Sequence, residues 1–108
     1  MEVIGLDTTT SVPLDFVRGK NPNNRLSIAI PNPFSDRTIL EFNVGAAEQV
    51  TLEVFDERGQ FVEMLIREEL EQGAYQATWD GASYASGTYY LRLVIGEWNE
   101  RRRVVILK

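Results

Sequence analysis

The sequence predicts an all-β protein, a sandwich of about seven antiparallel strands. Two observations carry this prediction. From Arg25 onward, apolar residues alternate with polar ones at a period of two, which is the period of a half-buried strand. Turn-forming residues separate the alternating segments at intervals of roughly a dozen residues, a spacing typical of sandwiches. The chain of 108 residues is long enough for one domain with a single core.

Seven segments show the strand pattern. In chain order they are RLSIAI (25–30), TILEFNV (38–44), VTLEVFD (50–56), QFVEMLI (60–66), AYQATW (74–79), TYYLRLVI (88–95) and RRRVVILK (101–108). Because alternate side chains of a strand share one face, each segment presents one apolar set to the core. The side chains expected to face inward are Leu26, Ile28, Ile30, Leu40, Phe42, Val44, Val50, Leu52, Val54, Tyr75, Ala77, Trp79, Tyr89, Leu91 and Leu93.

Two of the seven segments are less regular than the others. Val62 and Leu65 lie three residues apart, which predicts a bulge followed by a charged loop. The alternative there is a helix over 61–73, since FVEMLIREELEQG is rich in helix formers and ends in glycine. In the last segment the inward register is ambiguous, and the run from Arg101 to Arg103 directs charges to both faces.

Glycine and aspartate mark the predicted turns. Asp56 can accept backbone hydrogen bonds and Gly59 can take a positive φ, so DERG is expected to join two strands. The EQG segment at 71–73 is expected to play a similar part. Gly87 is expected to start a strand after a tight corner, and Gly96 to break the last hairpin.

The segment IPNPF at 30–34 is expected to be a stiff corner. Pro31 and Pro33 lack an N–H and bias the preceding residue to extended geometry, so this segment cannot be a central strand. It can carry the chain from one sheet edge to the other. Asn32 can close a local turn there, and Phe34 can close the open end of the core.

Residues 1–24 are interpreted as a linker or lead-in segment, and residues 25–108 as the domain. The lead-in holds a polar run and a cluster of chain breakers from Asn21 to Asn24. Val12, Leu14 and Phe16 alternate, so a short edge strand is an alternative there.

Composition excludes several functions. The net charge of −5 argues against nucleic acid and anionic lipid as partners. Because the chain has no cysteine or histidine, disulfides, thiolate or histidine metal sites and a Ser-His-Asp triad are impossible. No base, metal cluster or phosphate-binding loop accompanies the remaining polar residues, so we expect no enzyme activity and no cofactor. No apolar run reaches bilayer length, so no membrane insertion is expected.

Two further binding hypotheses are less favoured than structural roles for the same residues. Tyr75, Trp79, Tyr84 and Trp98 could form an aromatic platform for sugars, although Trp79 alternates with Ala77 and is expected in the core. The carboxylates of Glu68, Glu69 and Glu71, and the pair Asp56 and Glu57, could bind calcium. Their spacing matches no known loop, however, and a solvated charged edge is favoured.

Five segments occur together in a particular order: PNPFSDRTILEF, VTLEVFDERGQFVEML, GAYQATWDG, ASGTYYLRL and the final RRRVVILK. In that order and spacing, residues 25–108 resemble the C-terminal sorting domain of the type IX (Por) secretion system of Bacteroidetes-type bacteria. That family is closely related to the Ig-like domain of flagellar hook-capping proteins. The residues that match its motifs are Asn32, Pro33, Phe34, Asp56, Gly59, Trp79, Gly87, Tyr89, Leu93 and Lys108.

The resemblance implies an Ig-like β-sandwich that acts as a non-catalytic secretion and sorting signal. It implies an upstream cargo domain, recognition by an outer-membrane translocon, and export through the periplasm and outer membrane to the cell surface or medium. It also implies that a sortase-like protease cuts in or before residues 1–24 and attaches the cargo to a surface lipopolysaccharide.

The end of the chain is the expected recognition element. An exposed last strand can pair with a receptor sheet, and it can also pair two copies edge to edge. The residues assigned to recognition of the translocon are Arg103, Val104, Val105, Ile106, Leu107 and Lys108. The alternative hypothesis is a structural accessory or carbohydrate-binding β-sandwich domain of a secreted multidomain enzyme.

Overall fold

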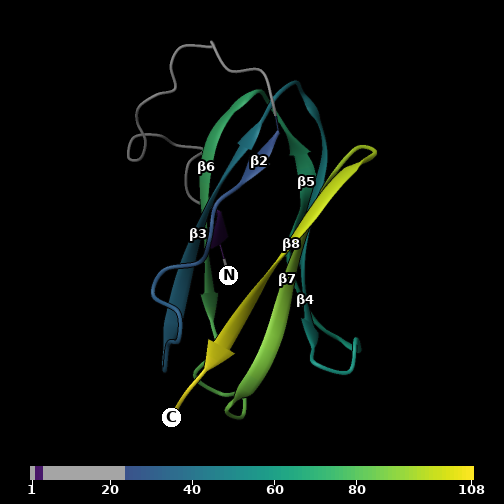
Figure 1. Cartoon of the computed structure of the whole chain (residues 1–108). Coiled ribbons are helices and arrows are strands. Elements are labelled where there is room, and N and C mark those ends of the chain that lie inside the picture. Colours follow the sequence, from purple (N-terminus) through teal and green to yellow (C-terminus); the bar gives the residue numbers. More distant parts are fainter. Residues whose placement is uncertain (1, 4–23) are drawn as a thin grey trace.

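Two antiparallel sheets pack face to face in the computed structural model, which describes residues 2–3 and 24–108 (Figure 1). One sheet has the strand order β1-β6-β3-β2 and the other β5-β4-β7-β8. The strands are β1 (Glu2–Val3), β2 (Arg25–Leu26), β3 (Arg37–Val44), β4 (Glu48–Asp56), β5 (Phe61–Leu70), β6 (Gly73–Asp80), β7 (Gly87–Ile95) and β8 (Trp98–Ile106). The predicted all-β sandwich is confirmed.

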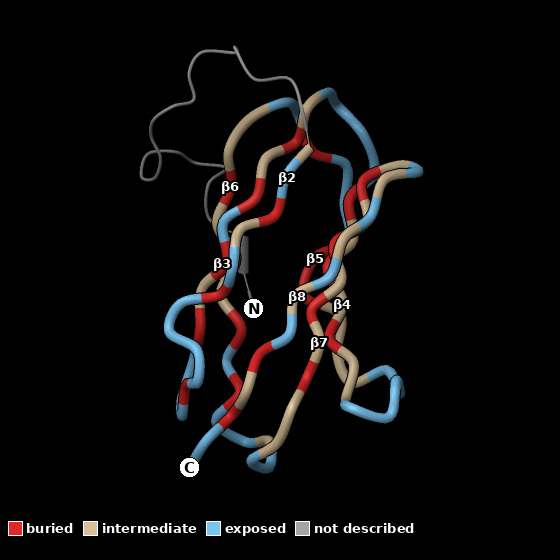
Figure 2. Tube along the Cα trace, viewed as in Figure 1, coloured by how far each residue is buried: buried red, intermediate tan, exposed pale blue. Residues whose placement is uncertain are grey.

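The core lies between the inner faces of the two sheets, where buried positions alternate with more exposed ones along β3, β4, β6 and β7 (Figure 2). The period of two predicted these inner faces correctly for β3, β4, β6 and β7. In β8, whose register the sequence left open, Val104 and Ile106 face inward. The inward-facing side chains of these strands are almost completely removed from water, and the burial of their apolar surface is the main favourable contribution to folding.

The segment after β2 departs from the predicted alternation. Ile28 and Ile30 were expected in the core, but each is 63% exposed, while Ala29 is buried. Backbone hydrogen bonds join Ser27 to Glu41 and Ile30 to Ile39. The chain therefore advances three residues on this segment while it advances two on β3. The one extra residue acts as a bulge and turns the following side chains to the other face.

Strand β5 is longer than predicted, and neither a helix nor a charged loop is present over its length. Residues 67–70, expected in a loop, continue the strand, because they pair with the first residues of β4. The predicted irregularity is confirmed: the pairing with β4 shifts twice, between Leu52 and Glu53 and between Val54 and Phe55. The shift at Leu52 leaves Leu65 without an opposite residue, and both Leu65 and Ile66 are buried.

Part of the predicted lead-in joins the sandwich. Glu2–Val3 forms β1, which pairs antiparallel with Ala77 and Thr78 of β6 at the edge of its sheet. The alternative edge strand over Val12, Leu14 and Phe16 lies outside the described residues.

The sandwich has two ends, and the distinction matters for function. We call the end formed by residues 31–36, 57–60, 81–86 and 107–108 the C-terminal end; it lies at the bottom of Figure 1. The opposite end carries the connections 45–47, 71–72 and 96–97, at the top of that view. Strand β8 runs from the opposite end to the C-terminal end, as an edge of its sheet.

Candidate functional site

The last strand is covered along the final part of its outer edge. The inner edge of β8 pairs with β7 over its whole length. On the outer edge, the Asn32 side-chain amide donates to the Arg103 carbonyl (3.2 Å) and accepts from the Val105 N–H (2.9 Å). One amide side chain therefore takes both hydrogen bonds that a neighbouring strand would make there.

Phe34 continues this cover with its backbone. Its N–H donates to the Val105 carbonyl (2.9 Å), and its carbonyl accepts from the Leu107 N–H (2.8 Å), which forms a parallel bridge beside Ile106. We call these contacts of Asn32 and Phe34 the clamp. Because Ile30 still bonds to β3, the corner carries the chain between the two sheets, as the prolines predicted. Both prolines follow cis peptide bonds.

The Phe34 side chain closes the core beneath the clamp. It is 4% exposed and meets the Trp79 ring edge to face, with 5.5 Å between centroids. Gly81 makes this approach possible, since a Cβ there would lie 3.0 Å from atoms of both Phe34 and Ile106. A larger residue at this position would push Phe34 or Ile106 aside by a few tenths of an ångström, so glycine allows this close packing.

A carboxylate anchors the aromatic cluster that surrounds Trp79. Glu63 of β5 lies opposite Val54, a buried residue of β4, so the Glu63 side chain turns inward. It accepts hydrogen bonds from the Trp79 indole N–H (3.2 Å) and from the Tyr84 hydroxyl (2.9 Å). Tyr89 also packs on Trp79, with centroids 5.3 Å apart. Burial raises the pKa of the Tyr84 hydroxyl, and the hydrogen bond to Glu63 and its charge raise that pKa further.

The last residue is tied to the loop before β7. The Lys108 N–H donates to the Ser86 hydroxyl (3.0 Å), and the Lys108 ammonium donates to the Ala82 carbonyl. Tyr89 holds the same loop, because its hydroxyl donates to the Ala85 carbonyl (2.8 Å). The end of the chain is thus fixed by the loop and by the clamp.

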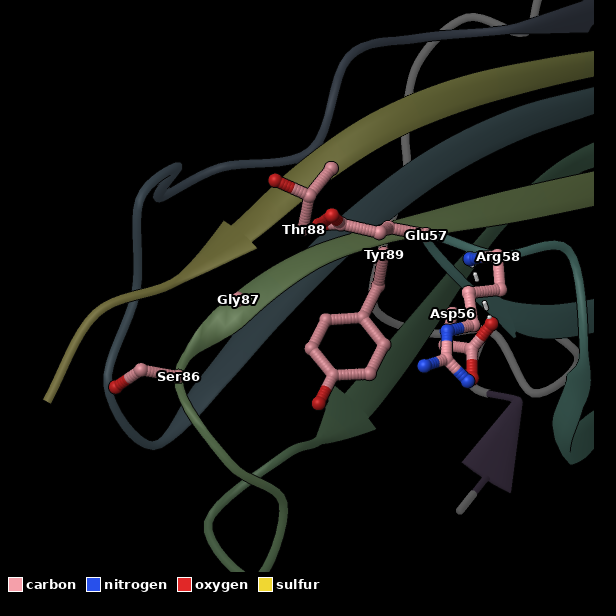
Figure 3. Close-up of a pocket in the computed structure, with 7 residues that line it drawn as sticks. All are labelled: Asp56, Glu57, Arg58, Ser86, Gly87, Thr88 and Tyr89. Atoms are coloured by element: carbon pink, nitrogen blue, oxygen red, sulfur yellow. Dashed lines mark hydrogen bonds between the residues drawn. The ribbon is translucent and has the colours of Figure 1, made fainter.

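The DERG turn lies beside the start of β7, as Figure 3 shows. The Asp56 carboxylate accepts from the backbone N–H groups of Arg58 and Gln60 (both 2.9 Å), and Gly59 has φ of 86°, as the turn pattern predicted. Together with residues 86–89 the turn lines a shallow depression of about 240 Å³. Asp56 and Tyr89 are also cross-strand partners.

The residues assigned from the sequence therefore divide into two groups. The first group comes together at the C-terminal end and consists of Asn32, Phe34, Trp79, Tyr89 and residues 103–108. The turns and strand ends there hold Pro33, Asp56, Gly59 and Gly87. Leu93 is a buried core residue further along β7. Among residues 103–108, Val104 and Ile106 are fully buried, so only the others present side chains outward.

Sequence reasoning missed Glu63, Gly81 and Arg102. A glutamate in an alternating segment looks solvent-facing, and only the bulge turns Glu63 inward. Arg102 sends its Nη2 to the Leu26 carbonyl (2.6 Å) and thereby links the edge strands of the two sheets. In the sequence, the position of Arg102 between Arg101 and Arg103 was the one indication that its side chain points to the opposite face.

Neither the aromatic sugar platform nor the calcium site considered from the sequence is supported by the described residues. Trp79 and Tyr75 are buried, and Trp98 packs partly against the core, so these rings form no common sugar platform. Within residues 2–3 and 24–108, no three acidic side chains are grouped so that they could hold a metal ion. The same part of the chain includes no helix with the length and apolar character needed to cross a membrane.

The comparison with known families agrees with this arrangement. Residues 29–107 match the sequence model of the secretion system C-terminal sorting domain. The matched range includes the corner, the aromatic cluster and β8. A search of curated proteins returned no match. A domain of this kind is a sorting signal, not a catalytic unit; it is attached to a cargo protein, interacts with the secretion machinery and directs export. The chain belongs to the family of C-terminal sorting domains for type IX secretion.

Proposed function

We propose that the domain is read by an outer-membrane translocon in its folded state, with the C-terminal end of the sandwich as the recognised region. The observation that carries this proposal is the clamp, which joins the two ends of the family match. Asn32 and Phe34 come from the motif that opens the match, and they fix residues 103–107 near its end.

The route follows from the same proposal. The attached cargo passes through the periplasm and across the outer membrane to the cell surface or the medium. A sortase-like protease then cuts before Arg25, in or upstream of residues 1–24, and residues 25–108 form the removable unit. Because β1 pairs with β6, a cut between β1 and β2 would separate one edge strand from its covalent link to the sandwich.

A clamped strand changes what the translocon can read. Addition of a receptor strand beside residues 103–107 would have to displace the hydrogen bonds of Asn32 and Phe34. Outward side chains of the folded end remain accessible, among them Arg103, Leu107 and Lys108. Recognition of the intact clamped end is therefore the form of the proposal that agrees best with these contacts.

The test is a transplant. Residues 1–108 are fused to the C-terminus of a periplasmic reporter in a bacterium that has the type IX system, and reporter is measured at the surface and in the medium. We expect export that disappears in a translocon-deficient strain. A folded fusion that stays in the periplasm of the competent strain would contradict the proposal and favour a structural accessory domain.

Deletion of the last strand would be an ambiguous control, because Val104 and Ile106 belong to the core. The sharper variant is Lys108→Ala, which removes the ammonium that reaches Ala82 and leaves the core intact. Export that falls while the thermal unfolding midpoint is unchanged would locate recognition at this end.

A further inference from the structure

The outer face of the sheet β5-β4-β7-β8 carries aromatic and arginine side chains in adjacent rows. Strand pairing places Phe61, Phe55, Tyr90 and Arg103 in one row across the four strands. The next row runs from Met64 through Glu53 and Arg92 to Arg101. We call the set Phe55, Phe61, Tyr90, Arg92, Arg101 and Arg103 the arginine–aromatic face.

The contacts within this face hold its rings and cations beside one another. The Arg101 guanidinium lies 5.3 Å from the Tyr90 ring centroid, and Phe55 meets Phe61 edge to face at 6.0 Å. Phe61 is 56% exposed, an unusual position for so large an apolar side chain in a soluble domain. Aromatic residues, methionine and arginine are enriched in protein interfaces, and tyrosine and arginine are among the residues that contribute most to binding energy.

The charge of this face differs from that of the chain. The chain has a net charge of −5, yet the two rows hold three arginines and a single carboxylate, Glu53, which lies 3.9 Å from Arg92. Two copies stacked about a two-fold axis perpendicular to the strands would place β8 against β8 and bring arginines close to arginines, which is unfavourable. The excess of arginine over carboxylate makes the face complementary to an acidic surface.

The clamp also directs a partner to this face. Because Asn32 and Phe34 occupy the outer edge of residues 103–107, a partner reaches that part of β8 through outward side chains. Arg103 is one of these, and Arg101 lies two residues before it on the same face. We propose that the arginine–aromatic face docks an acidic patch on a protein of the export machinery, an inference that rests on the proposed function.

The test compares two charge reversals of equal size in the reporter fusion. The double variant Arg101→Glu with Arg103→Glu alters the face. The matched control, Arg25→Glu with Arg37→Glu, alters two exposed arginines on the other sheet. We expect export to fall about tenfold or more for the first variant and to change less than about twofold for the control, since interface arginines are common hot spots.

A second variant separates docking from folding. Phe61→Ser removes an exposed ring without changing charge, and we expect reduced export with the thermal midpoint within a few degrees of the unaltered domain. If the face variants and the control are all exported like the unaltered fusion, the docking surface is wrong. If the unaltered fusion is itself not exported, the proposed function fails first, and this inference fails with it.

The nature of the partner needs its own measurement. Acidic-to-lysine substitutions in a component of the export machinery that restore export of the double variant would support an acidic protein patch. Sedimentation of the unaltered chain with phosphatidylglycerol vesicles, lost in the double variant, would overturn the inference in favour of a lipid surface. Concentration-dependent dimerisation that the double variant abolishes would overturn it in favour of self-association.

Discussion

The two halves of β8 are edges of the same sheet but are protected differently. Both halves pair with β7 on the inner side. Over Arg103–Ile106 the outer edge is covered by the clamp. At Arg101 the carbonyl accepts a hydrogen bond from the side chain of the next residue, Arg102 (3.0 Å), and no neighbouring segment among the described residues pairs with it. The open half instead carries charge: Arg101 is exposed, and Arg102 reaches across to Leu26.

This difference shows two ways of protecting one edge from unwanted pairing. A charged edge discourages addition of another strand but leaves the backbone groups available. A clamp satisfies those groups from within the chain. Here the Asn32 side chain and the Phe34 backbone form the clamp, so a short corner makes the hydrogen bonds that a neighbouring strand would otherwise make.

The largest expected effect comes from removing the ring beneath the clamp. Phe34→Ala should lower the free energy of unfolding by about 3–5 kcal/mol, because it leaves a cavity against Trp79 and Ile106. Urea unfolding measures this loss. Leu107→Ala is the control at the same end; it is 61% exposed and should change stability by less than about 0.5 kcal/mol. Equal losses for the two variants would show that the ring does not close the core.

An intermediate effect is expected when the amide of the clamp is removed. Asn32→Ala should cost about 1 kcal/mol, because it removes two hydrogen bonds at an exposed edge. Amide hydrogen exchange at Val105 should become about fivefold faster, while exchange at Arg101, on the open half, should not change. Unchanged exchange at Val105 would mean that the side chain does not protect that edge.

The smallest effect is expected at alkaline pH, and it concerns one tyrosine at each end of the sandwich. Burial raises the pKa of Tyr84 at the C-terminal end and of Tyr75 at the opposite end above the ordinary value of 10. The hydrogen bond to Glu63 and its charge raise the pKa of Tyr84 further. For Tyr75, the hydrogen bond to the Glu71 backbone lowers the pKa in part, and the charges of Glu71 and Glu68 raise it. A raised folded pKa gives stability that is fully present below pH 10 and is lost as the pH rises through the folded value.

Tyr84→Phe and Tyr75→Phe should each therefore make the thermal midpoint fall less steeply above about pH 10. Melting curves collected across that range provide the measurement. A slope that is the same in both variants and in the unaltered chain would contradict the assigned environments of these hydroxyls.

The long strands were predictable because their pattern is local. The alternation of Val50, Leu52 and Val54, for example, directly reflects one buried face. The turn at Asp56 and Gly59 was predictable for the same reason, since the carboxylate bonds to N–H groups two and four residues away.

What the sequence could not predict depends on partners far along the chain. The exposure of Ile28 and Ile30 follows from one extra residue opposite β3, and nothing in RLSIAI marks that residue. The role of Asn32 was expected to be a local turn, whereas its amide bonds to β8. Glu63 turns inward because of the bulge pairing with β4, which is set by the partner strand.

The clamp has a consequence for the order of folding. The β7–β8 hairpin closes through a two-residue turn. The hydrogen bonds of Asn32 to Arg103 and Val105, in contrast, close loops with sequence separations of 71 and 73 residues. Closing the longer loop costs more chain entropy, so we expect the hairpin to form early and the clamp late. In the interval β8 has a bare edge that can capture another unfolded chain, and aggregation during refolding should increase with protein concentration. Asn32 and Phe34 therefore end the period in which the newly formed edge is exposed.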